Sequence, residues 1–261
     1  IDALVGAQVL TLAESQEFNF SPVDKLGKII SKDYLETHIN AVLNYPLIQR
    51  EKIANKKLKV VVDSINSTGA TYVPAILKAL GVENIIVLNE TVNGHFAHNP
   101  EPLPEHLRQL CEEVVRTRAD IGIAVDPDVD RLCFVNEDGT LFGEEFTLVA
   151  VADFVLSQRK GNTVSNMSST KALRELTIHR GGTYTPAAVG EVNVVKKMKE
   201  TDAVIGGEGN GGIIVPDFHY GRDALIGLAL FLSHFANQDK SMSGFRKNYQ
   251  SYFISKNKKS Q

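Results

Sequence analysis

Apolar positions change their spacing regularly along the chain from residue 59 onward. Short β-branched runs alternate with longer segments in which apolar residues recur at helical spacing. The pattern up to residue 142 predicts strands at 59–63, 83–88 and 120–125, helices at 72–80 and 102–117, and a hairpin at 131–142. Because strands alternate with helices, we expect a mainly parallel sheet with helices on its faces.

The second half of the chain repeats this order after a break near residue 142. A helix at 144–160 comes first. It is followed by strands at 162–166 and 181–186, two strands around a glycine turn at 202–215, and helices at 168–176, 191–199 and 223–236. The repeat predicts an α/β fold of two similar three-layer α/β/α domains with mixed, mainly parallel sheets.

The first fifty-five residues are less regular. Residues 2–15 are compatible with a helix or a strand, residues 14–25 with a connector, and residues 32–44 with a helix that Pro46 ends. We therefore interpret residues 1–30 as the tail of a preceding domain with its connector. Residues 31–141 and 142–255 are then the two α/β domains.

Composition and charge narrow the class of protein. Of 261 residues, 43% are hydrophobic, and the net charge of -3 gives no reason to expect nucleic acid or an anionic membrane as partner. Lys256, Lys258 and Lys259 are interpreted as a solvated tail. Cys111 and Cys133 lie among apolar residues and are expected to be buried free thiols. Without a membrane-length apolar run or a charged leader, a cytoplasmic location is the default expectation.

The sharpest chemical signal is the loop DPDVDR, directly after the strand at 120–125. Asp126, Asp128 and Asp130 repel one another, and a hard divalent cation such as Mg²⁺ compensates such a cluster with oxygen ligands. Arg131 can neutralise the cluster or hold a phosphate beside the metal. A solvated acidic turn is the simpler alternative.

Two known motifs, a calcium-binding loop and a phosphatase loop, fit this sequence less well. An EF-hand would use Asp126, Asp128, Asp130 and Glu137, but Arg131 occupies the position that requires glycine, and the flanks are strands. A haloacid-dehalogenase-type phosphatase also uses an Asp-x-Asp loop, but it places that loop after its first strand.

A second loop, GGEGNGG at 206–212, again follows an apolar strand. Its glycines allow the backbone to approach a ligand closely. Glu208 and Asn210 offer acceptors and donors that suit vicinal sugar hydroxyls better than a phosphate. Taken alone, this loop is equally compatible with a flexible hairpin tip.

The two loops resemble those of the α-D-phosphohexomutases, the family of phosphoglucomutases, phosphomannomutases and phosphoglucosamine mutases. DPDVDR resembles the metal loop of the family and GEGNGG its sugar-binding loop. Other stretches resemble its second and third domains in the same order, over roughly residues 56–237: VVVDSINSTGA, FAHNPEP, ADIGIA, AVGEVNVVKKM and GRDAL.

This resemblance implies phosphoryl transfer between hexose 1-phosphate and 6-phosphate through a phosphoserine and a sugar bisphosphate. It implies that the three aspartates bind Mg²⁺, that Arg131 steadies the phosphoryl oxygens, and that Glu208 and Asn210 hold sugar hydroxyls. The phosphoserine motif is missing, since the His-Asn-Pro at 98–100 follows Ala97. We therefore expect domains two and three of a four-domain protein, inactive without the flanking domains.

Four positions depart from the family pattern. Pro127 replaces a glycine of the metal loop, and Asn210 and Gly212 replace a serine and a histidine of the sugar loop. In the loop that starts at Gly190, Glu191 stands where many members carry lysine or histidine. Glu191 is equally interpreted as a contact to an amino sugar or as a carboxylate at a helix N-terminus. These variants favour the phosphoglucosamine or phosphomannose branches.

Two minor residues and two other function classes stay open. His98 and Asn99 border the cleft or stiffen their loop, and Asp223 is explained as a helix cap. The alternatives to a mutase are a non-catalytic module that binds Mg²⁺ and sugar phosphate, and a metal-dependent phosphatase.

Overall fold

The computed structural model describes residues 3–252, and the chain divides into two units, Ile1–Tyr34 and Leu35–Gln261. The basic tail at 256–259 and the last three residues of the predicted second domain lie outside the described residues. Among residues 3–252, no helix is both long and apolar enough to cross a membrane.

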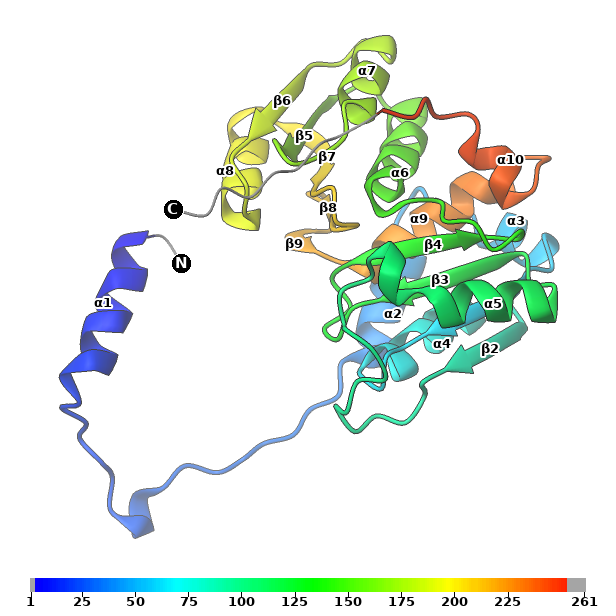
Figure 1. Ribbon diagram of the computed structural model, residues 1–261. Helices are drawn as coiled ribbons and strands as arrows, with labels where there is room; N and C mark the ends of the chain where they lie inside the picture. The colour runs from blue at the N-terminus through cyan, green and yellow to red at the C-terminus, as the bar shows by residue number, and fades with distance from the viewer. Residues whose placement is uncertain (1–2, 253–261) are drawn as a thin grey trace. The chain divides into compact units, whose positions relative to one another are not determined.

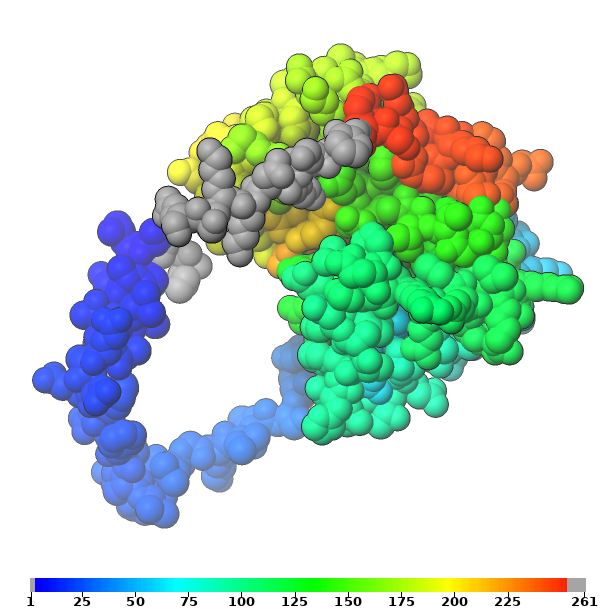
Figure 2. Space-filling model, viewed as in Figure 1, coloured from blue at the N-terminus to red at the C-terminus, as the bar shows by residue number. Residues whose placement is uncertain are grey.

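The first unit consists of one helix and a following segment that, in its described residues, has little regular secondary structure. Helix α1 spans Ala3–Ser15, which settles the choice between helix and strand, and a short 3-10 turn covers Val23–Lys25 (Figure 1). Helix α1 buries none of its residues. Large apolar side chains of this unit are exposed, including Leu4, Leu12, Phe20 and Ile29, and Figure 2 shows the unit in blue.

The second unit contains two sheets, of which the first has the order β2-β1-β3-β4. Strands β1, β2 and β3 are parallel, and β4 is antiparallel to β3. Their bounds are Lys59–Asp63 for β1, Asn84–Leu88 for β2, Ile121–Val125 for β3 and Leu132–Asn136 for β4. The predicted hairpin turns at Gly139, but its returning arm is reduced to one bridge between Val135 and Leu141.

The second sheet has the order β6-β5-β7-β8-β9 and repeats the arrangement of the first. Strands β5, β6 and β7 are parallel, whereas β8 and β9 each run antiparallel to their neighbour. Their bounds are Asn162–Asn166 for β5, Tyr184–Ala187 for β6, Ala203–Gly207 for β7, Ile213–Val215 for β8 and His219–Arg222 for β9. Residues 126–131, named the metal loop here after the role expected of them, follow β3, and residues 206–212, likewise named the sugar loop, follow the start of β7. The two loops therefore occupy equivalent strand ends.

Helices cover both faces of each sheet, as the apolar periodicity predicts (Figure 1). Helix α5 covers one face of the first sheet, and α8 covers one face of the second. The other helices pack on the opposite faces and around the unit. Their bounds, with those of α5 and α8, are Leu35–Leu43 for α2, Arg50–Asn55 for α3, Gly69–Ala79 for α4, Arg108–Thr117 for α5, Glu144–Gln158 for α6, Ala172–His179 for α7, Glu191–Glu200 for α8, Ala224–Ala236 for α9 and Met242–Arg246 for α10.

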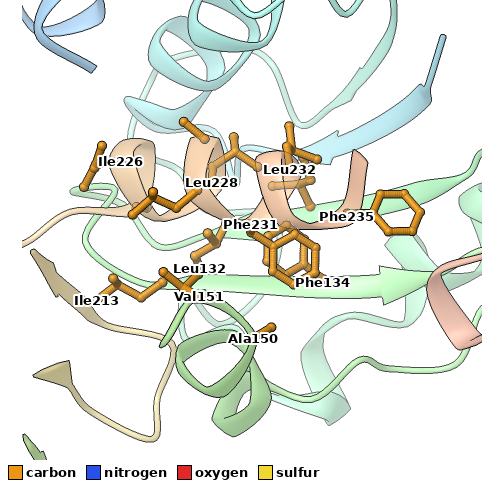
Figure 3. Packing of buried hydrophobic residues seen from close by; sticks show 14 of the residues in the cluster. Leu132, Phe134, Ala150, Val151, Ile213, Ile226, Leu228, Phe231, Leu232 and Phe235 are labelled. Atoms are coloured by element: carbon orange, nitrogen blue, oxygen red, sulfur yellow. The ribbon is translucent and has the colours of Figure 1, made fainter. Parts of the chain in front are cut away.

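Two of these helices join the sheets into one core. Helix α6 contacts both β4 and β7, and α9 contacts α6, α3, α4 and β8. The rings of Phe231 in α9 and Phe134 in β4 stack with centroids 3.8 Å apart (Figure 3). The core is continuous from one sheet to the other. We therefore expect the two α/β/α domains to unfold together.

The predicted helix at 102–117 differs from the structure at its start. A 3-10 turn at Pro104–His106 comes first, and α5 begins only at Arg108. Leu107 is buried between the two segments, so it faces the core as expected although it lies outside the α-helix. Prolines at 102 and 104 favour an extended or tight-turn start, which explains the delay.

A carboxylate at the start of α9 binds two histidines. Asp223 caps α9 by accepting hydrogen bonds from the backbone N–H groups of Leu225 and Ile226, as the sequence predicts. Nε2 of His38 and Nε2 of His219 each lie 2.9 Å from its Oδ2. The hydrogen bond with Asp223 raises the pKa of His38 above its usual 6.5, although partial burial opposes this.

This contact predicts a loss of stability as the pH rises above 6.5. A raised histidine pKa stabilises the fold fully below pH 6.5, and the stabilisation disappears as the pH rises through the folded value. We expect the free energy of unfolding to fall over this window, and to fall less in His38→Gln. Urea denaturation at pH 6, 7 and 8 measures it, with exposed His95→Gln as the control. Equal slopes in His38→Gln and the unaltered chain would exclude this origin.

Candidate active site

The metal loop is fixed by the segment that follows β1. The hydroxyls of Ser67 and Thr68 donate to the carbonyl of Pro127 at 2.9 and 2.6 Å. Oδ1 of buried Asp126 accepts hydrogen bonds from the backbone N–H groups of Asp130 and Arg131 at 3.0 and 2.9 Å. The loop therefore folds back around Asp126, which brings the three carboxylates together.

Oxygens of Asp126, Asp128 and Asp130 lie within 4.8 Å of one another. Oδ1 of Asp130 is buried and accepts no hydrogen bond from the described residues. Burial raises the pKa of Asp130, the hydrogen bond and the charge of Asp126 add to this effect, and Arg222 opposes it. A set of carboxylate oxygens with an unused lone pair fits a hard divalent cation such as Mg²⁺.

Arg131 remains beside the carboxylates. Its Nε lies 3.4 Å from Oδ2 of Asp126 and 3.8 Å from Oδ1 of Asp130, and its Nη1 lies 3.4 Å from Oε1 of Glu101. Nε itself is buried without a hydrogen bond among the described residues. The guanidinium is therefore held close to the acidic cluster while it keeps unused donors for an anionic group.

The sugar loop places Glu208 in the interior and Asn210 at the turn. Glu208 is 5% exposed and accepts hydrogen bonds from Nδ2 of Asn166 at 2.8 Å and Nη1 of Arg222 at 3.0 Å. Oδ1 of Asn210 accepts from the backbone N–H of Gly212 at 3.1 Å, which leaves its amide N–H groups for other partners. Thus Glu208 is positioned by two donors, and Asn210 also shapes the turn.

Gly190 and Glu191 lie at the start of α8. Gly190 has φ +110°, a conformation that favours glycine, and Glu191 is the first helical residue. Oε1 of Glu191 accepts a hydrogen bond from the backbone N–H of Arg222 at 3.1 Å. Glu191 therefore stands at the N-terminus of α8 and contacts Arg222, a partner that the sequence did not suggest.

Arg222, at the end of β9, connects these residues and was missed by the sequence analysis. Its Nη2 lies 2.6 Å from Oδ2 of Asp130, its Nη1 3.0 Å from Oε2 of Glu208, and its Nε 3.3 Å from Oε2 of Glu191. The side chain is only 15% exposed. Arg222 lies in GRDAL, a stretch that resembles the family, but its role was not visible in the sequence because its three partners lie outside that stretch.

A cavity of about 200 Å³ lies between the metal loop and the sugar loop. It is lined by residues of both loops and of four further segments, among them Glu101, Arg131, Asn166, Glu208 and Asn210. The backbone N–H of Leu132 donates to the carbonyl of Gly211 at 3.2 Å, which joins the two loops below the cavity. Asp128 instead lines a neighbouring cavity together with Thr68 and His219.

His98 positions the segment that carries Glu101. Its Nε2 lies 2.8 Å from Oδ2 of Asp63, which is 1% exposed at the end of β1. His98 and Asn99 do not line the cavity between the two loops, whereas Glu101, two residues further, does. The geometry favours the loop-stiffening interpretation of His98, and it adds Glu101 as a site residue that the sequence analysis missed.

Two family models match the parts of the chain that form this site. The model of the phosphoglucomutase/phosphomannomutase α/β/α domain II matches residues 33–139, and that of domain III matches residues 143–252. The chain belongs to the phosphoglucomutase/phosphomannomutase family. This result confirms the family expected from the loops and the expected fold class of two α/β/α domains.

Relatives of this phosphohexomutase chain have about twice its length. It is 32% identical over 247 residues to a phosphoglucomutase/phosphomannomutase of Thermococcus kodakarensis, and this match covers 94% of the chain and 54% of the relative. It is 32% identical over 232 residues to a probable phosphoglucosamine mutase of Methanopyrus kandleri, covering 88% of the chain and 50% of the relative. The chain thus spans about half the length of the curated relatives it matches.

Solved structures of phosphohexomutases have the same fold. A phosphoglucomutase/phosphomannomutase family protein of Burkholderia thailandensis matches with a TM-score of 0.75 at 28% identity, over 84% of this chain and 47% of that one. N-acetylphosphoglucosamine mutase of Aspergillus fumigatus, solved in complex with GlcNAc-6P and magnesium, matches with a TM-score of 0.60 over 83% of this chain and 49% of that one. At 15% identity, the second match shows the fold alone.

Proposed function

We propose that this chain supplies the metal-binding and sugar-binding part of an isomerase that interconverts hexose 1-phosphate and hexose 6-phosphate. The observation that carries the proposal is the position of the two loops. They follow the equivalent strands β3 and β7, are hydrogen-bonded to each other through Leu132 and Gly211, and line one cavity, through Arg131 of the first loop and Glu208 and Asn210 of the second. Phosphosugar mutases among the relatives support the same reaction class.

In this proposal Asp126, Asp128 and Asp130 hold Mg²⁺, which when bound withdraws charge from a transferring phosphoryl group. Their oxygens are close together, and Oδ1 of Asp130 has no competing hydrogen bond among the described residues. Arg131 donates to the phosphoryl oxygens, because its guanidinium lines the cavity and its partner Glu101 is a long 3.4 Å away.

Glu208 and Asn210 hold the sugar hydroxyls in this proposal. Glu208 is oriented by Asn166 and Arg222 before any ligand arrives, so it can accept hydrogen bonds without reorganisation. We place Gly190 and Glu191, at the start of α8, beside this sugar site because Val189, their neighbour in the chain, lines the cavity. A bisphosphorylated intermediate reorients between two transfers, and a phosphoserine supplied by a further domain of a longer protein gives and takes the phosphoryl group.

The sugar that we propose is an amino sugar or mannose phosphate. The support is the Methanopyrus kandleri relative, a probable phosphoglucosamine mutase, together with Asn210, Gly212 and Glu191 at positions that differ from the common family pattern. Both cysteines carry free thiols, which agrees with the cytoplasmic location that we expect.

A coupled mutase assay tests this function. Glucosamine, mannose and glucose 1-phosphates are supplied with Mg²⁺ and a sugar bisphosphate to this chain and to a longer protein with both flanking regions. We expect turnover only by the longer protein, fastest with glucosamine or mannose 1-phosphate. Release of free phosphate instead of isomerised sugar would replace the mutase proposal with the phosphatase alternative. Binding without turnover by the longer protein would favour the non-catalytic module.

A further inference from the structure

Arg222 is the shared partner of two loops that the proposed function assigns different ligands. Asp130 belongs to the metal loop and Glu208 to the sugar loop, and one guanidinium contacts both, through Nη2 at 2.6 Å and Nη1 at 3.0 Å. The contact is formed in a largely buried position, where charge interactions are stronger than at the surface. A change at one carboxylate must therefore affect the contact with the other.

The contacts of Arg222 are also incompletely satisfied. Nε of Arg222 is buried and makes no hydrogen bond among the described residues, although Oε2 of Glu191 lies 3.3 Å away. On the metal side, Oδ1 of Asp130 is buried and equally lacks a hydrogen bond. A small movement of the guanidinium away from Asp130 would release a carboxylate for a cation and allow a better contact with Glu191.

We propose that Arg222 couples cation binding at the metal loop to the arrangement of the sugar-binding residues. A divalent cation and Arg222 compete for the charge of Asp130, so a bound cation weakens the contact between Arg222 and Asp130. Arg222 then binds Glu208 and Glu191 more firmly, and Glu208 lines the cavity of the proposed sugar site. By linkage, any change that strengthens the contact between Arg222 and Glu208 also raises the affinity for the cation. The inference rests on the proposed magnesium site.

A second connection between the loops must be separated from this one. The backbone of Leu132 donates to the carbonyl of Gly211, and Arg131 forms a bridge with Gly212. These backbone contacts could transmit a change between the loops without Arg222. The experiment therefore has to compare side-chain variants that leave the backbone bridge in place.

A double-mutant cycle of Mg²⁺ affinity makes this comparison. Calorimetry measures Mg²⁺ binding to the unaltered chain, Arg222→Gln, Glu208→Gln and the double variant, without any sugar. We expect Arg222→Gln to bind Mg²⁺ more tightly, because the competitor for Asp130 is gone. We expect Glu208→Gln to weaken Mg²⁺ binding when Arg222 is present. This loss of affinity should be at least about fivefold larger than the loss caused by the same substitution in Arg222→Gln, within the usual range of coupling.

Controls keep the cycle interpretable. Arg174→Gln removes an exposed arginine of α7 outside the site and should leave the Mg²⁺ affinity unchanged. If Arg222→Gln does not fold, as circular dichroism would show, the same cycle is run with Arg222→Lys. A lysine keeps the charge but cannot bridge three carboxylates, so the coupling should shrink.

Each outcome decides the proposal. Additive effects of the two substitutions, or weaker Mg²⁺ binding in Arg222→Gln, would overturn the coupling through Arg222 and favour the backbone connection or a purely orienting role. If the unaltered chain binds no Mg²⁺, both the proposed magnesium site and the coupling fail. If it binds Mg²⁺ but shows no coupling, the coupling alone fails and the proposed function stands.

Discussion

Asp128→Asn should weaken Mg²⁺ binding by about 100-fold or more while the fold keeps its stability. Removing a residue that binds the cation directly should reduce the affinity by more than the 10–100-fold that is typical when a residue supporting such a ligand is changed. Asp128 is exposed, and the described contacts include no hydrogen bond of its side chain, so the amide should change the free energy of unfolding by less than about 0.5 kcal/mol. Calorimetry with Mg²⁺ and urea denaturation measure the two quantities on the same preparation.

Two further variants make this prediction specific. Asp239→Asn removes an exposed carboxylate that follows α9, outside the site, and should alter neither quantity. Asp126→Ala should lower both the Mg²⁺ affinity and the stability of the fold, because buried Asp126 accepts two backbone hydrogen bonds within the loop. Unchanged Mg²⁺ affinity in Asp128→Asn would show that the loop DPDVDR does not hold the cation through this residue.

Phe231→Ala should destabilise the protein by about 3–5 kcal/mol, the usual cost of truncating a buried phenylalanine. The ring is fully buried in α9 and stacks on Phe134 (Figure 3). It also has edge contacts with Phe142 and Phe245. These partners come from different segments of the chain, so the surroundings cannot close the cavity by a local shift. The measurement is the midpoint of urea unfolding, followed by far-ultraviolet circular dichroism.

The shape of the transition tests the shared core at the same time. Because α9 and α6 join the two sheets, we expect one cooperative transition that moves as a whole in Phe231→Ala. Phe96→Ala, at a 41% exposed position, serves as the size-matched control and should shift the midpoint little. Two separate transitions, of which only one moves, would contradict a common core.

The parts of the site that lie on one short segment could be predicted from the sequence. Asp126, Asp128 and Asp130 are adjacent in one loop, and Glu208 and Asn210 share another, so their chemistry is visible in the local pattern. Arg222 and Glu101 lie in the stretches GRDAL and FAHNPEP, which resemble the family, but neither stretch shows which partners these residues contact. Their partners become neighbours only when β9 and the segment 98–103 are placed against the two loops.

The fold shows the same division between local and distant information. Strands with β-branched runs, such as β1 and β3, and helices with long apolar runs, such as α6 and α9, agree with the predicted segments. Strand β9 was missed because HYGR has no apolar alternation, and its pairing with β8 supplies the reason for its conformation. Tertiary pairing here overrides a weak local preference.

Transfer of labelled phosphate from a sugar bisphosphate tests the central claim most directly. Glucose 1,6-bisphosphate carrying the label is incubated with Mg²⁺ and either this chain or a longer protein with both flanking regions, and mass spectrometry locates the modified residue. A mutase whose metal and sugar loops lie in this chain predicts a labelled serine outside residues 1–261 in the longer protein, and no label on this chain alone. Label on an aspartate of the loop DPDVDR would contradict that account, because the loop would then be a phosphatase nucleophile.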